Sequence, residues 1–319
     1  MAGDIAAVGA ECSLATVTGD DSEADRVSEL LGATSTKGQQ IRLPGIQTVT
    51  RLRYFVPDEG GGRLRLHLRV DKDPDSNLSY ARIEQEIRAP GFLEWWEEEA
   101  ERSDAVLFSD TDKGFLSRRV LVALNERILR ASARRVARGA SPVAVVVDPK
   151  REWDKYVGLR VDVLKPNDVE AAGAAGLTRL DWSVDANLVA LAGTIGEKYG
   201  TLFPNIVITL GEHGAAMIAV EGRRARVVRF PAIPSRVPAT GFAMHCGDMF
   251  ASALALSLCV DPRLVPAIPF ATYVASLQVS KPVGQKITAS DLTDPLNLQH
   301  LRDSIFPART WVEVDLNSR

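Results

Sequence analysis

The chain has 319 residues, an apolar fraction of 45% and a net charge of −3. This length suits one large α/β domain or two smaller ones. The charge argues against a general nucleic-acid binder, which usually has a basic face. No apolar run approaches the roughly 18 residues that a membrane-spanning helix needs, so we expect no membrane span.

The first residues and the cysteines bear on the compartment. The start, MAGDIAAVGAECSLATV, lacks the basic region of a signal peptide. The three cysteines, Cys12, Cys246 and Cys259, are odd in number and have no metal-binding spacing. We therefore expect reduced thiols in the cytoplasm or another reducing intracellular compartment. The four histidines are scattered, which makes a zinc site improbable.

The chain begins with short elements and then changes character. Residues 4–10 look like the end of a helix that stops at Gly9, followed by a strand over 14–18 and a helix over 22–31. Residues 47–71 alternate apolar and polar side chains around a Gly60-Gly61-Gly62 turn. This pattern predicts two strands with one wet face, with arginines on that face. We expect them to form a lid rather than part of a buried parallel sheet.

From about Tyr80 the pattern is that of an alternating α/β fold. Short apolar runs predict buried strands, and longer amphipathic runs predict the helices between them. The expected helices cover 83–102, 118–138, 184–199 and 264–280, and the expected strands cover 105–108, 142–147, 161–164, 205–210, 215–220 and 225–230. We predict a single domain over residues 1–319, with a mostly parallel sheet flanked by helices and the lid strands of 47–71 inserted in it.

Polar side chains follow the buried strands. The carboxyl ends of parallel strands meet at one edge of a sheet, where ligands bind in α/β proteins. The residues expected to meet there are Asp110, Asp148, Asn167, Glu170 and Glu212.

A helix begins at Gly247-Asp248, after a loop that contains two glycines. The unpaired N–H groups and the dipole at a helix N-terminus favour an anion. A carboxylate beside an anion site suits phosphoryl transfer, because it can take the proton of an attacking hydroxyl. The alternative is that Asp248 only caps the helix.

The order of motifs resembles that of the PfkB/ribokinase family of carbohydrate kinases, and within it the heptose-7-phosphate kinases. The matching segments are TVTGDD (16–21), TVTRLRYF (48–55), LRVDKD (68–73), LFSDTDKGFLS (107–117), VVDPKREWDKYVGLRVDVLKPNDVE (146–170) and ITLGEHGA (208–215). The resemblance implies a ribokinase-like fold, ATP and Mg²⁺ as cofactors, and a sugar or sugar phosphate as substrate.

The resemblance also implies roles for single residues. Asp248 would be the general base, and Gly247 would contribute to the anion hole for the transferred phosphate. Asn167 and Glu170 would organise Mg²⁺ through water, although the same pair also fits a helix capping box. The residues implied at the nucleotide are Thr209, Gly211, Glu212, Gly214, Thr272 and Asn167, and those implied at the sugar phosphate are Asp110, Lys113 and the lid residues Arg51 and Arg53.

Two features depart from the family pattern. Where the family has Thr-Gly-Ala-Gly-Asp, this chain has Met244-His245-Cys246-Gly247-Asp248, so His245 replaces a glycine that would let backbone approach phosphate closely. The family's first core strand precedes the first segment matched here. Either the start is truncated or the protein has lost this strand, and a core without the strand would have an open sheet position with exposed edges, which a partner chain could cover.

The leading hypothesis is an ATP- and Mg²⁺-dependent sugar or sugar-phosphate kinase, as a homodimer through the lid or as a subunit of a hetero-assembly. A second hypothesis is a kinase-fold protein without catalysis that serves as a structural or interaction subunit. A third is an adenosine- or fructose-type kinase, which the DPK…LKPN segment and the position of Lys113 favour less.

Overall fold

The computed structural model of the chain describes all residues except 35, 58–63, 74–75, 179, 223, 236–244, 283, 305–309 and 317–319. The expected Gly60-Gly61-Gly62 turn and Met244 lie outside the described residues. No described helix is long and apolar enough to cross a membrane.

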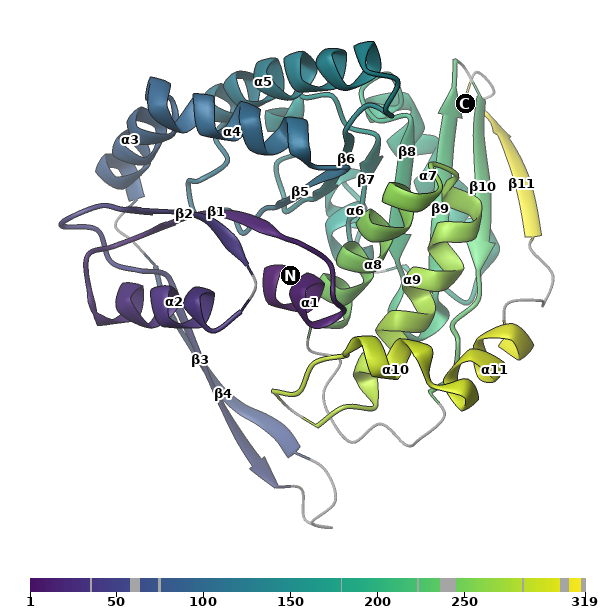
Figure 1. Cartoon of the computed structure of the whole chain (residues 1–319). Coiled ribbons are helices and arrows are strands. Elements are labelled where there is room, and N and C mark those ends of the chain that lie inside the picture. The colour runs from purple at the N-terminus through teal and green to yellow at the C-terminus, as the bar shows by residue number, and fades with distance from the viewer. Residues whose placement is uncertain are drawn as a thin grey trace.

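A seven-stranded sheet forms the centre of the molecule (Figure 1), in the order β11-β10-β9-β8-β7-β6-β5. Its strands are β5 (Ala105–Ser109), β6 (Ala144–Asp148), β7 (Val163–Leu164), β8 (Asn205–Thr209), β9 (Ala215–Glu221), β10 (Arg224–Phe230) and β11 (Thr310–Asp315). Strands β5 to β8 are parallel, and β9 to β11 continue the sheet with antiparallel pairs. The predicted α/β class is confirmed.

Helices cover both faces of this sheet. The alternation of side chains along a strand explains this: Val145 and Val147 belong to one buried cluster and Val146 to the other. The first face packs against α3 (Ser76–Ile87), α4 (Pro90–Arg102), α5 (Arg118–Ala137), α6 (Asp168–Ala174) and α7 (Asp185–Tyr199). The second face packs against α8 (Cys246–Val260) and α9 (Leu264–Val279).

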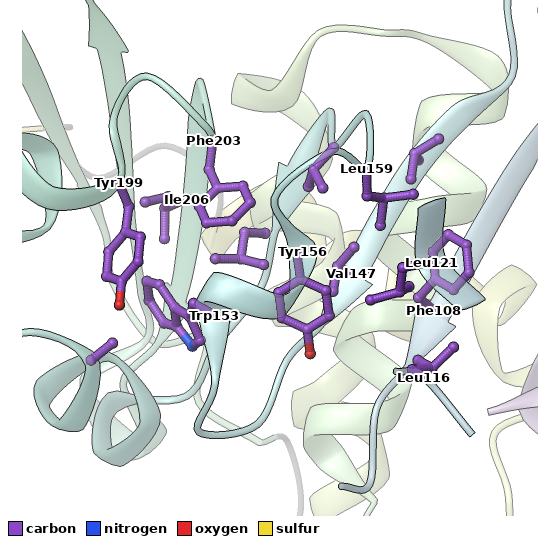
Figure 2. Close-up of a cluster of buried hydrophobic side chains, with 14 of the residues drawn as sticks. Phe108, Leu116, Leu121, Val147, Trp153, Tyr156, Leu159, Tyr199, Phe203 and Ile206 are labelled. Atoms are coloured by element: carbon purple, nitrogen blue, oxygen red, sulfur yellow. The ribbon is translucent and has the colours of Figure 1, made fainter. Parts of the chain in front are cut away.

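An aromatic cluster anchors the loop that follows β6 (Figure 2). Trp153 and Tyr156 lie in a 3₁₀ turn (Trp153–Tyr156) and are fully buried. The ring centroid of Trp153 lies 5.1 Å from that of Tyr199 on α7, and Phe203 packs beside both rings. Burial of large aromatic rings stabilises the conformation of this loop. Lys150 and Arg151, which lie in the same loop, are therefore held in place by the packing of Trp153 and Tyr156.

The N-terminal part forms a separate layer. It contains α1 (Ala2–Ala7), β1 (Ser13–Thr18), α2 (Ser22–Gly32) and β2 (Lys37–Arg42). Strands β1 and β2 pair in parallel in a sheet of their own. The sequence did not predict β2, because KGQQIR contains a single apolar side chain, Ile41, and no alternation of apolar and polar residues. The predicted first helix ends at Ala7, two residues before Gly9, which has a φ of 88°, and the predicted first strand ends at Thr18 as expected.

Strands β3 (Thr50–Pro57) and β4 (Leu64–Lys72) form an antiparallel ribbon that projects from the body (Figure 1). These are the two strands predicted within 47–71.

One predicted helix needs correction, and three further elements were missed. The single helix expected over 83–102 is divided into α3 and α4, because Pro90 is the first residue of α4 and Ala89 before it is extended. The short helices α10 (Ala289–Thr293) and α11 (Pro295–Ser304), and the strand β11, were not predicted.

Candidate active site

Polar groups from the ends of β5, β6, β7 and β8 meet at one edge of the sheet, as the sequence predicts. The backbone N–H of Asp110 donates to the carbonyl of Asp148, and a bridge joins Asn167 to Thr209. Glu212 is the exception, because its side chain is 91% exposed and its recorded ion partner is the adjacent His213, at 3.9 Å.

Two lysine–carboxylate pairs lie at this edge. The Nζ of Lys165, which is 2% exposed, lies 3.0 Å from Oδ1 of Asp148. The Nζ of Lys150 lies 2.6 Å from Oε1 of Glu170. Burial raises the pKa of Asp148, and the charge of Lys165 opposes that rise. The two lysines place buried or half-buried positive charge close to the helix that begins at Cys246.

Asp110 lies below the surface rather than on it. Its Oδ2 accepts a hydrogen bond of 2.5 Å from the hydroxyl of Tyr156 and lies 2.5 Å from the Nζ of Lys155. Burial and the charge of Asp110 raise the pKa of Tyr156, so the hydroxyl stays protonated and donates. Its Oδ1 accepts from the backbone N–H of Asp112, so both carboxylate oxygens have partners within the protein. The expected contact of Asp110 with substrate stays a prediction.

Asn167 and Glu170 form a complete capping box at the start of α6. The side-chain oxygen of Asn167 accepts from the N–H of Glu170, and Oε2 of Glu170 accepts from the N–H of Asn167. The capping alternative that the sequence left open is therefore realised. Because Lys150 takes the other oxygen of Glu170, both carboxylate oxygens already have partners. A role toward metal through water stays a prediction.

Helix α8 begins beside the lysine pairs. Its N-cap residue is His245, and Asp248 stands in its first turn. The Nδ1 of His245 lies 3.3 Å from Oδ2 of Asp248. Burial alone would raise the pKa of Asp248, but the hydrogen bond and charge of His245, together with Lys165, lower it. The carboxylate is therefore ionised and can accept a proton.

The lid ribbon has two different faces. The register places Leu52 opposite Val70 and Tyr54 opposite Leu68 on one face, whereas Arg53 stands opposite Arg69 on the other. The apolar residues of the first face are exposed at between 36% and 53%. The alternation predicted from the sequence thus separates an apolar face from a basic one.

The basic face of the ribbon and the edge of the sheet enclose a cavity of about 610 Å³. It is lined by Arg51, Arg53, Arg69, Asp71, Thr111, Asp112, Lys113, Lys150, Arg151, His245 and Asp248. Six arginines and lysines thus face three aspartates. The Nε of Arg51 is buried and has no hydrogen-bond partner among the described residues. Such a group requires an anionic or hydrogen-bond-accepting ligand, or water, to satisfy it.

Four of the predicted site residues line this cavity: Arg51, Arg53, Lys113 and Asp248. Gly247 adjoins it, and a Cβ at Gly247 would lie 3.8 Å from the Nζ of Lys165. The sequence did not single out Arg69, Lys150 or Arg151 as site residues. The sequence could have identified Arg69 as a residue of the polar face, because it lies two residues after His67 on β4 and alternate residues of a strand share a face.

The residues predicted at the nucleotide lie on three elements. Thr209 ends β8, and Gly211 and Gly214 bracket the turn between β8 and β9 at φ values of 58° and 86°. A Cβ at Gly214 would lie 2.2 Å from the carbonyl oxygen of Phe230, so glycine is required there. Thr272 is buried within α9, and its hydroxyl donates to the carbonyl of Ile268. Their contacts with nucleotide stay predictions.

Relatives of known sequence extend these observations. The pattern of the pfkB family carbohydrate kinases matches residues 68–290. The chain is 27% identical to the bifunctional protein HldE of Trichlorobacter lovleyi over 310 residues, which is 95% of this chain and 55% of that protein. It is 27% identical to the HldE of Gluconobacter oxydans over 88% of this chain and 52% of that protein. The chain thus spans about half the length of these curated relatives.

Solved structures share the fold. A ribokinase from Arabidopsis thaliana, complexed with ribose and ATP, superposes with a TM-score of 0.65 at 16% identity, over 94% of this chain and 85% of that one. Phosphofructokinase-2 from Escherichia coli gives a TM-score of 0.65 at 15% identity, over 95% and 85%. Identities this low support the fold alone. With the family pattern covering more than half of its residues, the chain belongs to the pfkB family of carbohydrate kinases.

Proposed function

We propose that this chain phosphorylates a hydroxyl of a sugar that already carries a phosphate, with ATP as the phosphoryl donor. The observation that carries the proposal is that one cavity holds both an accessible carboxylate, Asp248, and an excess of arginine and lysine side chains. Arg69, Lys113 and Lys150 are paired with Asp71, Asp73 and Glu170, but Arg51, Arg53 and Arg151 have no ion partner among the described residues, so a neutral sugar would leave these three arginines without a counterion. A sugar phosphate supplies a dianion that they can bind.

Asp248 is the proposed general base. Its side chain is 41% exposed, so a substrate hydroxyl can reach it, and it stands in the first turn of α8. Phosphoryl transfer depends mainly on positioning and on neutralising charge. The dipole of α8, whose positive end lies at its N-terminus, and the nearby Lys165 supply positive potential for the transferred group. The base and the anion site thus stand next to each other.

The lid arginines are proposed to bind the phosphate of the sugar. Arg51 and Arg53 lie on the ribbon, while Lys113 approaches from the loop after β5. Arginine and lysine from two separate elements can bind the phosphate from different directions and fix the sugar for in-line attack. The resemblance of the chain to heptose-7-phosphate kinases supports a heptose-phosphate-like substrate of this kind.

ATP is proposed to bind along the turn that follows β8, with Thr209, Gly211, Glu212, Gly214 and Thr272 as its surroundings. Among the described residues, no group of three His, Cys, Asp or Glu side chains stands ready to hold a metal ion. This fits Mg²⁺, which is usually held by substrate phosphates, water and one or two protein groups. Asn167 and Glu170 would hold it through water, and Mg²⁺ would neutralise charge on the phosphates.

The apolar face of the ribbon supports a homodimer. Leu52, Tyr54, Leu68 and Val70 form a patch on an element that projects from the body. A second copy can cover this patch by presenting the same face, which gives a closed twofold interface. Sedimentation of the wild type and of Leu68→Lys tests this. None of the three cysteines forms a disulfide, which is compatible with the proposed reducing intracellular compartment.

A kinase assay with matched sugars tests the function. Wild type should transfer phosphate from Mg-ATP to a heptose or hexose phosphate far better than to the same sugar without its phosphate. Asp248→Asn should lower kcat by roughly 10²- to 10⁴-fold, the usual contribution of a general base. Its affinity for ATP and its Tm should remain close to those of wild type. Equal rates for the two proteins would remove Asp248 from this role, and no turnover by wild type would favour the structural-subunit hypothesis.

A further inference from the structure

His245 has a backbone conformation that its side chain does not favour. Its φ is 64°. Asp112 is the only other non-glycine residue with a positive φ among those that the structure describes. It occupies the N-cap of α8 but makes no capping hydrogen bond with its side chain. Neither local backbone preference nor capping explains a histidine here. Strain of this kind persists where surrounding contacts hold it, and it is frequent at functional sites.

The contact that does engage the ring is with the proposed base. The Nδ1 of His245 lies 3.3 Å from Oδ2 of Asp248, three residues further along the chain. The two side chains are 54% and 41% exposed, and both line the cavity. The left-handed residue at the helix start therefore brings an imidazole against the carboxylate without covering it.

Other cations compete for this carboxylate. Lys150 and Lys165 lie near enough for their charges to act on Asp248, although each already has a partner, Glu170 and Asp148 respectively. Lys150 lines the cavity, whereas Lys165 is buried and does not line it, so a carboxylate drawn toward Lys165 would turn away from a sugar hydroxyl. A donor on the cavity side, on the same turn of chain, counters that pull.

We propose that His245 is a positioning residue, which holds the carboxylate of Asp248 at the cavity through Nδ1–H so that Oδ1 is left for the sugar hydroxyl. This inference rests on the proposed function. Donation from Nδ1 also sets the neutral ring's tautomer, with Nε2 as an acceptor. The charged and titratable groups that share the cavity are Arg51, Arg53, Arg69, Asp71, Asp112, Lys113, Lys150 and Arg151.

Two substitutions of His245 test whether its ring positions the carboxylate of Asp248 or is merely tolerated at this site. His245→Gly removes the ring and also relieves the positive φ, so its Tm should equal or exceed that of wild type. If His245 positions the base, this variant should lose kcat by roughly 10- to 100-fold while KM for the sugar changes little. His245→Asn tolerates the same backbone and keeps an N–H donor, so it should recover most of the loss. A glycine variant as fast as wild type, or faster, would overturn the proposal.

Nitrogen-15 NMR tests the pair without any turnover. The imidazole signals of His245 are identified by their disappearance in His245→Asn. In Asp248→Ala, the ¹⁵N chemical shift of Nδ1 should change, because this nitrogen has lost the carboxylate oxygen that lies 3.3 Å away. An unchanged shift would overturn the pair itself. A changed shift in a protein that transfers phosphate to no sugar would instead overturn the kinase function, and with it the catalytic purpose of the pair.

Discussion

Arginine side chains gather in two regions of this molecule and are used differently in each. Between α4 and α5, Arg127 and Arg134 both donate to Glu97, and Arg134 also donates to Glu101. Glu97 is only 7% exposed. In the cavity beneath the lid, Arg69, Lys113 and Lys150 pair with Asp71, Asp73 and Glu170, whereas Arg51, Arg53 and Arg151 have no ion partner among the described residues.

The difference separates charges that hold the fold from charges that are available to a ligand. On α4 and α5 the opposite charge comes from the neighbouring helix, so the network is complete without any other molecule. In the cavity the buried Nε of Arg51 lacks a partner among the described residues. Cations left in excess within a concave site raise the local concentration of anions.

Removal of the lid arginines tests the cavity most directly. The double variant Arg51→Met with Arg53→Met should lower kcat/KM for a sugar phosphate by roughly 100-fold, because each charge-assisted hydrogen bond is worth about 1.5–3 kcal/mol. The rate with the unphosphorylated sugar should change little. Arg65→Met is the matched control, since Arg65 lies on the same ribbon and does not line the cavity. Equal losses for both sugars would show that these arginines do not bind the phosphate.

Removal of the central glutamate tests the helix network. Glu97→Gln should reduce the free energy of unfolding by about 1–2 kcal/mol, because it leaves two arginines without their shared partner. Its kinase parameters should equal those of wild type. Glu98→Gln is the control, since Glu98 is 65% exposed and pairs loosely with Arg102 at 3.7 Å, an arrangement worth less than about 1 kcal/mol. Urea denaturation measures both, and similar losses in the two variants would contradict the network.

The same network predicts a pH dependence. Burial alone would raise the pKa of Glu97, but the hydrogen bond from Arg127 and the charges of Arg134 and Arg130 lower it below the ordinary value of 4.5. A lowered pKa in the fold means that the ionised group stabilises the protein above pH 4.5 and that this contribution disappears as the pH falls further. The stability difference between wild type and Glu97→Gln should therefore be constant near neutrality and shrink below pH 4.5. A difference that grows in acid would have the wrong sign.

The smallest expected effect is the stabilisation of the folded protein by inorganic phosphate bound in the cavity. At about five times its Kd, phosphate should stabilise wild type by about 1 kcal/mol through binding to the folded state. Arg65→Met should respond equally, and the Arg51/Arg53 double variant should not respond. Thermal melts in matched concentrations of chloride separate binding from general salt effects. A response retained by the double variant would place the anion elsewhere.

Much of the site could be predicted because it depends on local rules. The polar residues after β5, β6 and β7 follow buried apolar runs, and a parallel sheet brings such ends together. Asp248 stands out because a carboxylate follows a glycine at the start of an Ala-rich helix. The capping box of Asn167 and Glu170 was visible as a three-residue spacing.

Other features depend on partners far away in the chain. Asp110 looked available to substrate, yet Tyr156 and Lys155, more than forty residues further on, engage its carboxylate. The polar strand β2 forms only because β1 offers it an edge. No local pattern reveals β11, which returns from the C-terminal end to pair with β10.

By itself, the sequence determined the alternation of the lid strands, the strands β5 to β10 of the central sheet, and the carboxylate at the start of α8. These follow from the two- and 3.6-residue periods of strands and helices, which need no distant contact. Only the tertiary structure decided which cations are neutralised within the protein and which remain for a ligand. Charge pairing depends on distances of a few ångströms between segments that only folding brings together.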